Sequence, residues 1–133
     1  MRIPVIKVGN NLIVSIQSDI DDKTALDLEF HLLEKIVKTK ATGVLIELSS
    51  LDMVDSFLGR LLSDIAVSSS TLNADTVVVG IQPAVAITLV ELGLFLRGVH
   101  TALNVEEGIE LLKKLSLERY EINEHNTDDD KNT

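Results

Sequence analysis

The sequence has no cysteine and no tryptophan among its 133 residues. Without cysteine, the chain can form no disulfide, no thiolate metal site and no thiol nucleophile. Aromatic residues make up only 3% of the chain, which disfavours the stacking platforms that bind single-stranded nucleic acid. Basic residues are also few, because 12 Lys and Arg stand against 21 Asp and Glu, for a formal charge of −9. That balance argues against binding to nucleic acid or to anionic membrane surfaces.

A long uninterrupted apolar run is absent as well. The most apolar segment, residues 83–96, contains Glu91 and is too short to span a bilayer. Residues 1–11 lack the apolar region of a signal peptide. Hydrophobic residues nevertheless make up 45% of the chain, which is enough for one core and for a buried partner surface besides. We therefore expect a soluble, cytoplasmic protein with one folded domain.

The first forty residues predict a hairpin followed by a helix. Residues 5–17, VIKVGNNLIVSIQ, have the pattern of two strands about a Gly-Asn-Asn turn. Residues 19–40 change to helical spacing, with aspartates at the start and lysines at the end, as the helix dipole favours. The apolar stripe predicted for this helix consists of Leu26, Phe30, Leu33 and Val37.

The remaining segments alternate strand and helix. Apolar runs at 43–49 and 76–81 predict strands covered on both faces, and residues 98–103 predict a last short strand. Helices are predicted over 56–66, from Pro83 to Gly93, and after Asn104, where a capping-box pattern begins. The order β-β-α-β-α-β-α-β-α predicts an α/β domain with a mixed, mostly parallel sheet of about five strands and about four helices.

The C-terminal segment differs in composition from the rest. Residues 118–133 contain six acidic and two basic residues, and the last eight, NTDDDKNT, offer no apolar side chain to bury. Such a segment cannot offset the entropy cost of ordering itself. We expect residues 1–117 to form the domain and residues 118–133 to form an acidic, disordered tail.

Motifs of common enzyme classes are missing. The sequence has neither a Walker-type phosphate loop nor a GxGxxG string after a strand, and its three histidines are scattered without metal-ligand spacing. Ser56 lies between a strand and a helix, as a nucleophile elbow does, but Val54 and Leu58 stand where such a hydrolase needs glycines. We expect no enzymatic activity, no cofactor and no metal, with a serine hydrolase as the open alternative.

The segment LDMVDSFLGRLL, residues 51–62, places Ser56 at the start of a predicted helix. Its hydroxyl is suited to capping that helix, but Asp55 can cap equally well and would leave Ser56 free. Orphan N–H groups and the helix dipole favour an anion at this end. A phosphate on Ser56 would add about −1.5 to −2 charges beside Asp52 and Asp55, which would repel acidic partner groups and impose a desolvation cost on contact with apolar ones. Ser56 is therefore a candidate phosphorylation switch that requires little refolding.

Neighbouring residues suggest weaker roles. Phe57 is expected in the core or in a dimer contact, and Asp52, Asp55 and Arg60 are candidate partner contacts whose alternative is a solvated surface. Rival hydroxyl side chains lie within or after the same predicted helix, away from its anion-favouring end; they are Ser63, Ser68, Ser69, Ser70 and Thr71. The string SSST, residues 68–71, is typical of a helix terminus and turn.

Four sequence strings carry a resemblance to a known family. They are LIVSIQ (12–17), DDKTAL (21–26), VDSFLGRLL (54–62) and GIQPAVAITLVELGL (80–94). In this order they resemble the STAS domain family, the fold of anti-sigma-factor antagonists and sulfate transporters, over about residues 1–116. Within that family they resemble RsbS-type chains more closely, the small single-domain scaffolds of the bacterial stressosome. The resemblance places the family's phosphorylated serine at Ser56.

The resemblance also implies partners. Such a scaffold forms a homodimer and joins RsbR-type STAS proteins in a large hetero-oligomeric core that sequesters an RsbT-type serine kinase. Under stress the kinase phosphorylates the serine and leaves, and an RsbX-type phosphatase resets the site. The alternative within the family is a stand-alone anti-sigma-factor antagonist that is regulated by phosphorylation of the same serine.

Overall fold

The computed structural model describes residues 3–18, 20–93 and 98–131. Strands and helices alternate in it as the sequence predicts. In chain order they are β1 (Ile6–Val8), β2 (Asn11–Ser15), α1 (Asp22–Thr39), β3 (Gly43–Glu47), α2 (Ser56–Thr71), β4 (Asp75–Val79), α3 (Pro83–Glu91), β5 (Val99–Ala102) and α4 (Val105–Lys131).

In the described part of the chain, the strands form one five-stranded sheet in the order β1-β2-β3-β4-β5. β1 and β2 pair antiparallel, with Ile6 opposite Ile13, and Gly9 takes a positive φ of 59° in the turn between them. The other neighbouring strands pair in parallel. The mixed, mostly parallel α/β sheet predicted from the sequence is therefore confirmed.

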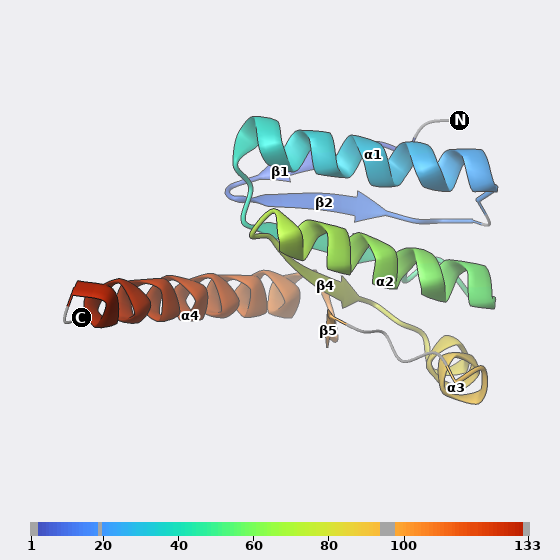
Figure 1. Cartoon of the computed structure of the whole chain (residues 1–133). Coiled ribbons are helices and arrows are strands. Elements are labelled where there is room, and N and C mark those ends of the chain that lie inside the picture. The colour runs from blue at the N-terminus through green and yellow to red at the C-terminus, as the bar shows by residue number, and fades with distance from the viewer. Residues whose placement is uncertain (1–2, 19, 94–97, 132–133) are drawn as a thin grey trace.

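Helices cover both faces of the sheet. α1 and α2 lie side by side on one face, where Leu12, Val14 and Ile16 are buried beneath them (Figure 1). On the other face α4 packs Leu112 against β3 and β4. A Cβ at Gly108 of α4 would lie only 2.6 Å from Val79 Cγ1, so the glycine is what lets this helix approach the sheet closely.

The apolar stripe predicted for α1 is wrong about which face is buried. Leu26, Phe30 and Val37 expose 67%, 69% and 64% of their surface. The helix instead buries Ala25, Leu28, Leu32 and Ile36. Leu33, the fourth predicted residue, is half-buried and packs against the core. Both sets recur with a helical period, and three members of one set are adjacent in sequence to members of the other, so spacing alone cannot decide which set faces the sheet. α1 therefore presents an exposed apolar stripe to solvent.

α2 follows its predicted face and runs further than predicted. Leu58, Leu61, Leu62 and Ile65 are all buried, as expected. The helix continues through Thr71, five residues past the predicted end at residue 66. None of the described helices is long and apolar enough to cross a membrane.

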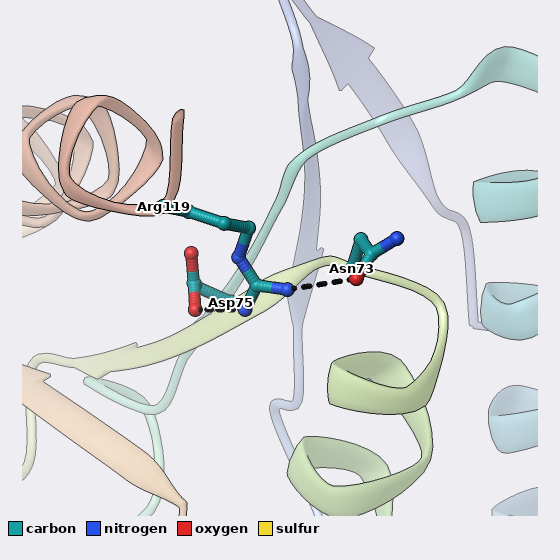
Figure 2. A network of polar contacts seen from close by, with 3 residues as sticks. All are labelled: Asn73, Asp75 and Arg119. Carbon is teal, nitrogen blue, oxygen red and sulfur yellow. Dashed lines mark hydrogen bonds and ion pairs between the residues drawn. The ribbon is translucent and has the colours of Figure 1, made fainter. Parts of the chain in front are cut away.

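The acidic end of the chain differs from its predicted disorder. α4 continues to Lys131, so residues 118–131 are helical, and the helix projects beyond the sheet (Figure 1). Arg119 attaches this extension to the start of β4, with Nη2 at 2.7 Å from Asp75 Oδ1 and Nη1 donating to Asn73 Oδ1 at 3.2 Å (Figure 2). No glycine or proline interrupts residues 109–131, so nothing local ends the helix. The domain boundary at residue 117 stays a prediction.

Candidate functional site

Ser56 is the first residue of α2 and its side chain is exposed. The preceding loop, residues 48–55, leaves the carboxyl end of β3, as loops that carry functional residues in α/β sheets commonly do. Asp55 is the N-cap, in an extended conformation, and its Oδ1 accepts a hydrogen bond from Leu58 N at 2.9 Å. The Ser56 hydroxyl makes no hydrogen bond to any residue that the structure describes. Asp55 thus caps the helix, and the hydroxyl of the neighbouring Ser56 is not needed for the cap.

The start of α2 keeps donors available for an anion. Asp55 satisfies Leu58 N with its carboxylate and Gly59 N with its carbonyl oxygen, the latter at 3.3 Å. The N–H groups of Ser56 and Phe57 come earlier in the first turn, where no intrahelical acceptor exists. Together with the helix dipole, these groups make added negative charge on Ser56 tolerable for the helix.

Glu47 holds the loop that leads to Ser56. Its Oε1 accepts from Ser49 N at 2.6 Å, and its Oε2 accepts from Ser15 Oγ at 3.0 Å. Gln82 adds a second restraint, because its Nε2 donates to Ser49 O at 2.7 Å. Burial raises the pKa of Glu47, but the hydrogen bonds from Ser49 and Ser15 outweigh that effect and bring the pKa below its ordinary value. The carboxylate is therefore charged at neutral pH, and each of its two oxygens accepts a hydrogen bond.

Gly80 leaves room for this contact. It has a positive φ of 74°, and a Cβ there would lie 3.0 Å from Glu47 Oε1 and 3.1 Å from Ser49 Cβ. Both the backbone conformation and the close approach favour glycine at this position. The beginning of the loop is thus held by Glu47 at the end of β3 and by Gln82 before α3, and Gly80 leaves room for the Glu47 contact.

A small hollow adjoins Ser56 on the loop side. Its volume is about 30 Å³, which holds about one water molecule and no substrate. The lining consists of Ser18, Ile20, Leu51, Met53, Val54, Asp55, Phe57 and Leu58. None of these described residues is a histidine, so the hollow does not assemble the base that a serine hydrolase requires. Beside it, Met53 exposes 76% of its surface.

A larger groove of about 390 Å³ lies between α1 and α2. Phe57 lines both the small hollow and this groove, and Arg60 lines the groove alone. Of the four predicted contact residues, the structure therefore brings Asp55 and Phe57 together at the hollow and Phe57 and Arg60 at the groove. Asp52 is exposed in the loop and lines neither.

The rival hydroxyl groups have different surroundings. Ser69 is fully buried, and its Oγ has no hydrogen-bond partner among the described residues. Ser68 Oγ donates to Glu29 Oε1 at 3.2 Å, and Thr71 Oγ1 donates to Ser68 O at 2.6 Å. Ser70 is exposed, but it lies near the C-terminal end of α2, where the dipole disfavours an anion.

Sequence reasoning missed Glu47, Met53 and Gln82. Glu47 had a usable signal, because it is the one charged residue at the end of the apolar run 43–49. Gln82 and Met53 had none, since their roles depend on segments that meet only in the fold. Within the described residues, no three histidine, aspartate or glutamate side chains come together in a way that could hold a metal ion.

Comparison with known proteins places this geometry in a family. The family model for the STAS domain matches residues 2–108. The chain is similar to the solved structure of an RsbS point variant from Moorella thermoacetica, with 38% identity and a TM-score of 0.74 over 86% of this chain and 97% of that chain. It is also similar to a chain in a structure of the molecular architecture of the stressosome, with 40% identity and a TM-score of 0.73 over 85% of this chain and 98% of that chain.

A curated relative gives a more distant match. The RsbT co-antagonist protein RsbRA of Bacillus subtilis (strain 168) is 28% identical over 108 residues, which are 80% of this chain and 39% of RsbRA. The chain thus spans about two fifths of the length of that relative. Because the family match covers most of the chain and the likeness to RsbS covers nearly all of that protein, the chain belongs to the STAS domain family.

Proposed function

We propose that this chain is a non-enzymatic scaffold of a cytoplasmic stressosome that co-assembles with RsbR-type proteins. The similarity to RsbS and to a stressosome chain, over almost the full length of both, supports the proposal. A second support is the exposed apolar surface. Leu26, Phe30 and Val37 form an exposed stripe along α1, and Ile87 and Val90 are exposed on α3. Contiguous exposed apolar surface of this kind marks interaction sites.

The proposed switch is phosphorylation of Ser56 by an RsbT-type kinase that the assembly holds. The observation that carries it is the free, exposed Ser56 hydroxyl at the start of α2, with Asp55 supplying the cap. A phosphate would leave that cap intact and would add about two negative charges beside Asp52 and Asp55. A kinase that docks acidic or apolar groups on this loop would then meet charge repulsion or a cost of desolvation and leave, and an RsbX-type phosphatase would reset the site.

Size-exclusion chromatography with an RsbR-type partner tests the scaffold. At native salt we expect the two proteins to elute together as one particle far larger than either protein alone. Separate elution at every mixing ratio would contradict the scaffold.

Kinase binding by Ser56 variants tests the switch. Ser56→Ala should hold the RsbT-type kinase as the wild type does and should retain it after Mg-ATP is added, because no charge can be introduced. Ser56→Asp should weaken retention only partly, since one carboxylate carries less charge than a phosphate. Ser70→Asp, which adds the same charge at the far end of α2, is the matched control and should bind normally. Equal binding by the Ala and Asp variants at position 56 would refute the electrostatic account.

The stand-alone anti-sigma-factor antagonist uses the same serine and differs in its partners. It would bind an anti-sigma kinase one to one and would build no core, so it has less need of the apolar surface on α1 and α3. Capture of such a kinase in the absence of any RsbR-type partner, with no large particle formed, would favour this alternative.

A further inference from the structure

The groove between α1 and α2 is built from one face of each helix. The two helices lie side by side (Figure 1). The lining residues are Asp22, Ala25, Leu26 and Glu29 from α1 and Phe57, Arg60, Leu61 and Asp64 from α2. In both helices they are spaced i, i+3, i+4 and i+7, which is the spacing of residues on a single helical face. The groove therefore runs along both helices for about two turns, roughly 12 Å at about 1.5 Å per residue.

The floor of the groove is apolar. Ala25 and Leu61 are buried at 3% and 6% exposure, and Phe57 is half-buried. Leu26 rises along one side with most of its surface in solvent. A floor of this kind gains free energy when an apolar side chain covers it, at roughly 25 cal/mol for each Å² removed from water.

The rim of the groove is acidic. Three carboxylates line it, those of Asp22, Glu29 and Asp64, against the single cation of Arg60. The excess of acid continues on the outer side of α1, where a second hollow is lined by three more carboxylates and one lysine: Asp21, Asp27, Glu34 and Lys23. Carboxylates clustered around a floor of low dielectric constant attract cations more strongly than they would in open water.

We propose that this groove binds a basic amphipathic helix from a partner protein. The expected segment has apolar residues at i, i+3 or i+4, and i+7, which seat on the floor, and lysines or arginines at its flanks, which meet the rim. The proposal takes its context from the proposed scaffold function, and it names the chemistry of a partner that the function leaves open. A second copy of this chain is a poor occupant, because its net charge of −9 would bring like charges to the rim.

The groove lies next to Ser56, so charge added at Ser56 should affect its occupant. The effect on a basic helix in the groove is expected to differ from the effect on the kinase. Phe57 follows Ser56 directly, and Arg60 lies one turn further along the same face of α2. Negative charge added at Ser56 strengthens the field that a basic helix meets, whereas the same charge disfavours a kinase that docks acidic or apolar groups on the loop. The groove partner should therefore stay bound, or bind more tightly, when the kinase is released.

A synthetic peptide tests the groove in the full chain. The probe is a labelled, amidated peptide of about 16 residues, made of Leu, Ala, Lys and Arg, with its leucines on one helical face; the control is a scrambled peptide of the same composition. Fluorescence anisotropy at physiological salt should show binding of the amphipathic peptide at least about tenfold tighter than binding of the scrambled one. Equal affinities would overturn the proposal, because they would reduce it to nonspecific attraction between opposite net charges.

Substitutions in the groove locate the binding. Leu26→Ser should weaken binding of the peptide about tenfold, and Val90→Ser, which alters an even more exposed apolar residue on α3, should leave it unchanged. Asp22→Asn combined with Asp64→Asn should weaken binding severalfold and flatten its dependence on salt. Equal effects of Leu26→Ser and Val90→Ser would overturn the proposal.

Ser56→Asp separates the groove from the kinase switch. We expect the affinity for the peptide to be unchanged or up to about threefold higher in this variant. Weaker binding of the peptide by Ser56→Asp would overturn the groove proposal. Normal binding of the peptide together with unaltered kinase retention would refute the switch and leave the groove standing.

Discussion

At the scale of single residues, the start of α2 divides two tasks between neighbours. The Asp55 carboxylate accepts the hydrogen bond from Leu58 N, so the helix does not need the adjacent Ser56 hydroxyl as its cap. A serine that capped its own helix would have to exchange that hydrogen bond for one to the phosphate when it was modified. Here modification would leave the cap in place, which is what a switch that keeps the fold intact requires.

Substitutions should separate the cap from the hydroxyl. Ser56→Ala should change the free energy of unfolding by less than about 0.5 kcal/mol, as most surface substitutions do. Asp55→Ala should lower it by about 1 kcal/mol, because the helix loses its cap. Urea denaturation of the two variants measures both values. A larger loss for Ser56→Ala than for Asp55→Ala would show that the cap has been assigned to the wrong residue.

Glu47 gives the loop a dependence on pH whose sign can be worked out. Its pKa is lowered in the folded chain, so its contribution to stability is fully present above the pKa of the unfolded chain and is lost as the pH falls through the lower, folded value. The Ser49 amide, which donates to Glu47, should report this titration in an NMR pH series. We expect a midpoint below the ordinary glutamate value and no such titration in Glu47→Gln. A midpoint above the ordinary value would contradict the hydrogen-bonded arrangement.

At the scale of elements, α1 carries two apolar stripes with different roles. The inner stripe, around Leu32, closes the core over the sheet, and the outer stripe, around Phe30, faces solvent. Leu32→Ala should therefore lower the free energy of unfolding by about 2–5 kcal/mol. Phe30→Ala should lower it by less than about 1 kcal/mol, although phenylalanine is the larger side chain. Urea denaturation of the two variants compares these losses. A larger loss for Phe30→Ala than for Leu32→Ala would show that the stripe around Phe30 is the buried one.

The order of the elements could be predicted from the sequence because each signal is local. Apolar runs such as 43–49, the Gly9 turn and the Asn104 cap all act within a few residues, and the structure has a strand, a turn and a cap at these places. The inner face of α1 could not be predicted in the same way. Leu26 and Ala25 are adjacent members of two equally regular patterns, and only packing against the sheet selects the second.

The helical end of α4 and the groove could not be predicted from the sequence either. The contact of Arg119 with Asp75 joins residues that are 44 positions apart, so composition alone predicted disorder for the segment. The groove combines residues 22–29 with residues 57–64, which meet only after α1 and α2 have packed side by side. Ser56 could be singled out from the sequence because its position at the start of a predicted helix, after Asp52 and Asp55, is a local pattern.

At the scale of the whole molecule, the surface combines strong net acidity with exposed apolar side chains. The charge of −9 opposes the close approach of acidic surfaces, whereas exposed residues such as Phe30, Met53 and Val90 favour association. An assembly that covers the apolar side chains and leaves the acidic ones in solvent is compatible with both properties. The proposed hetero-oligomeric core fits that balance, with Ser56 as the position where charge is added and removed.

The most direct test of the central claim is the intact mass of the chain after incubation with Mg-ATP and an RsbT-type kinase. Wild type and Ser56→Ala are compared, with a known substrate of the same kinase confirming that the enzyme is active. We predict one added phosphate on the wild type and none on Ser56→Ala. Equal labelling of both, or no labelling of either by the active, correctly paired kinase, would contradict the claim that Ser56 is the switch.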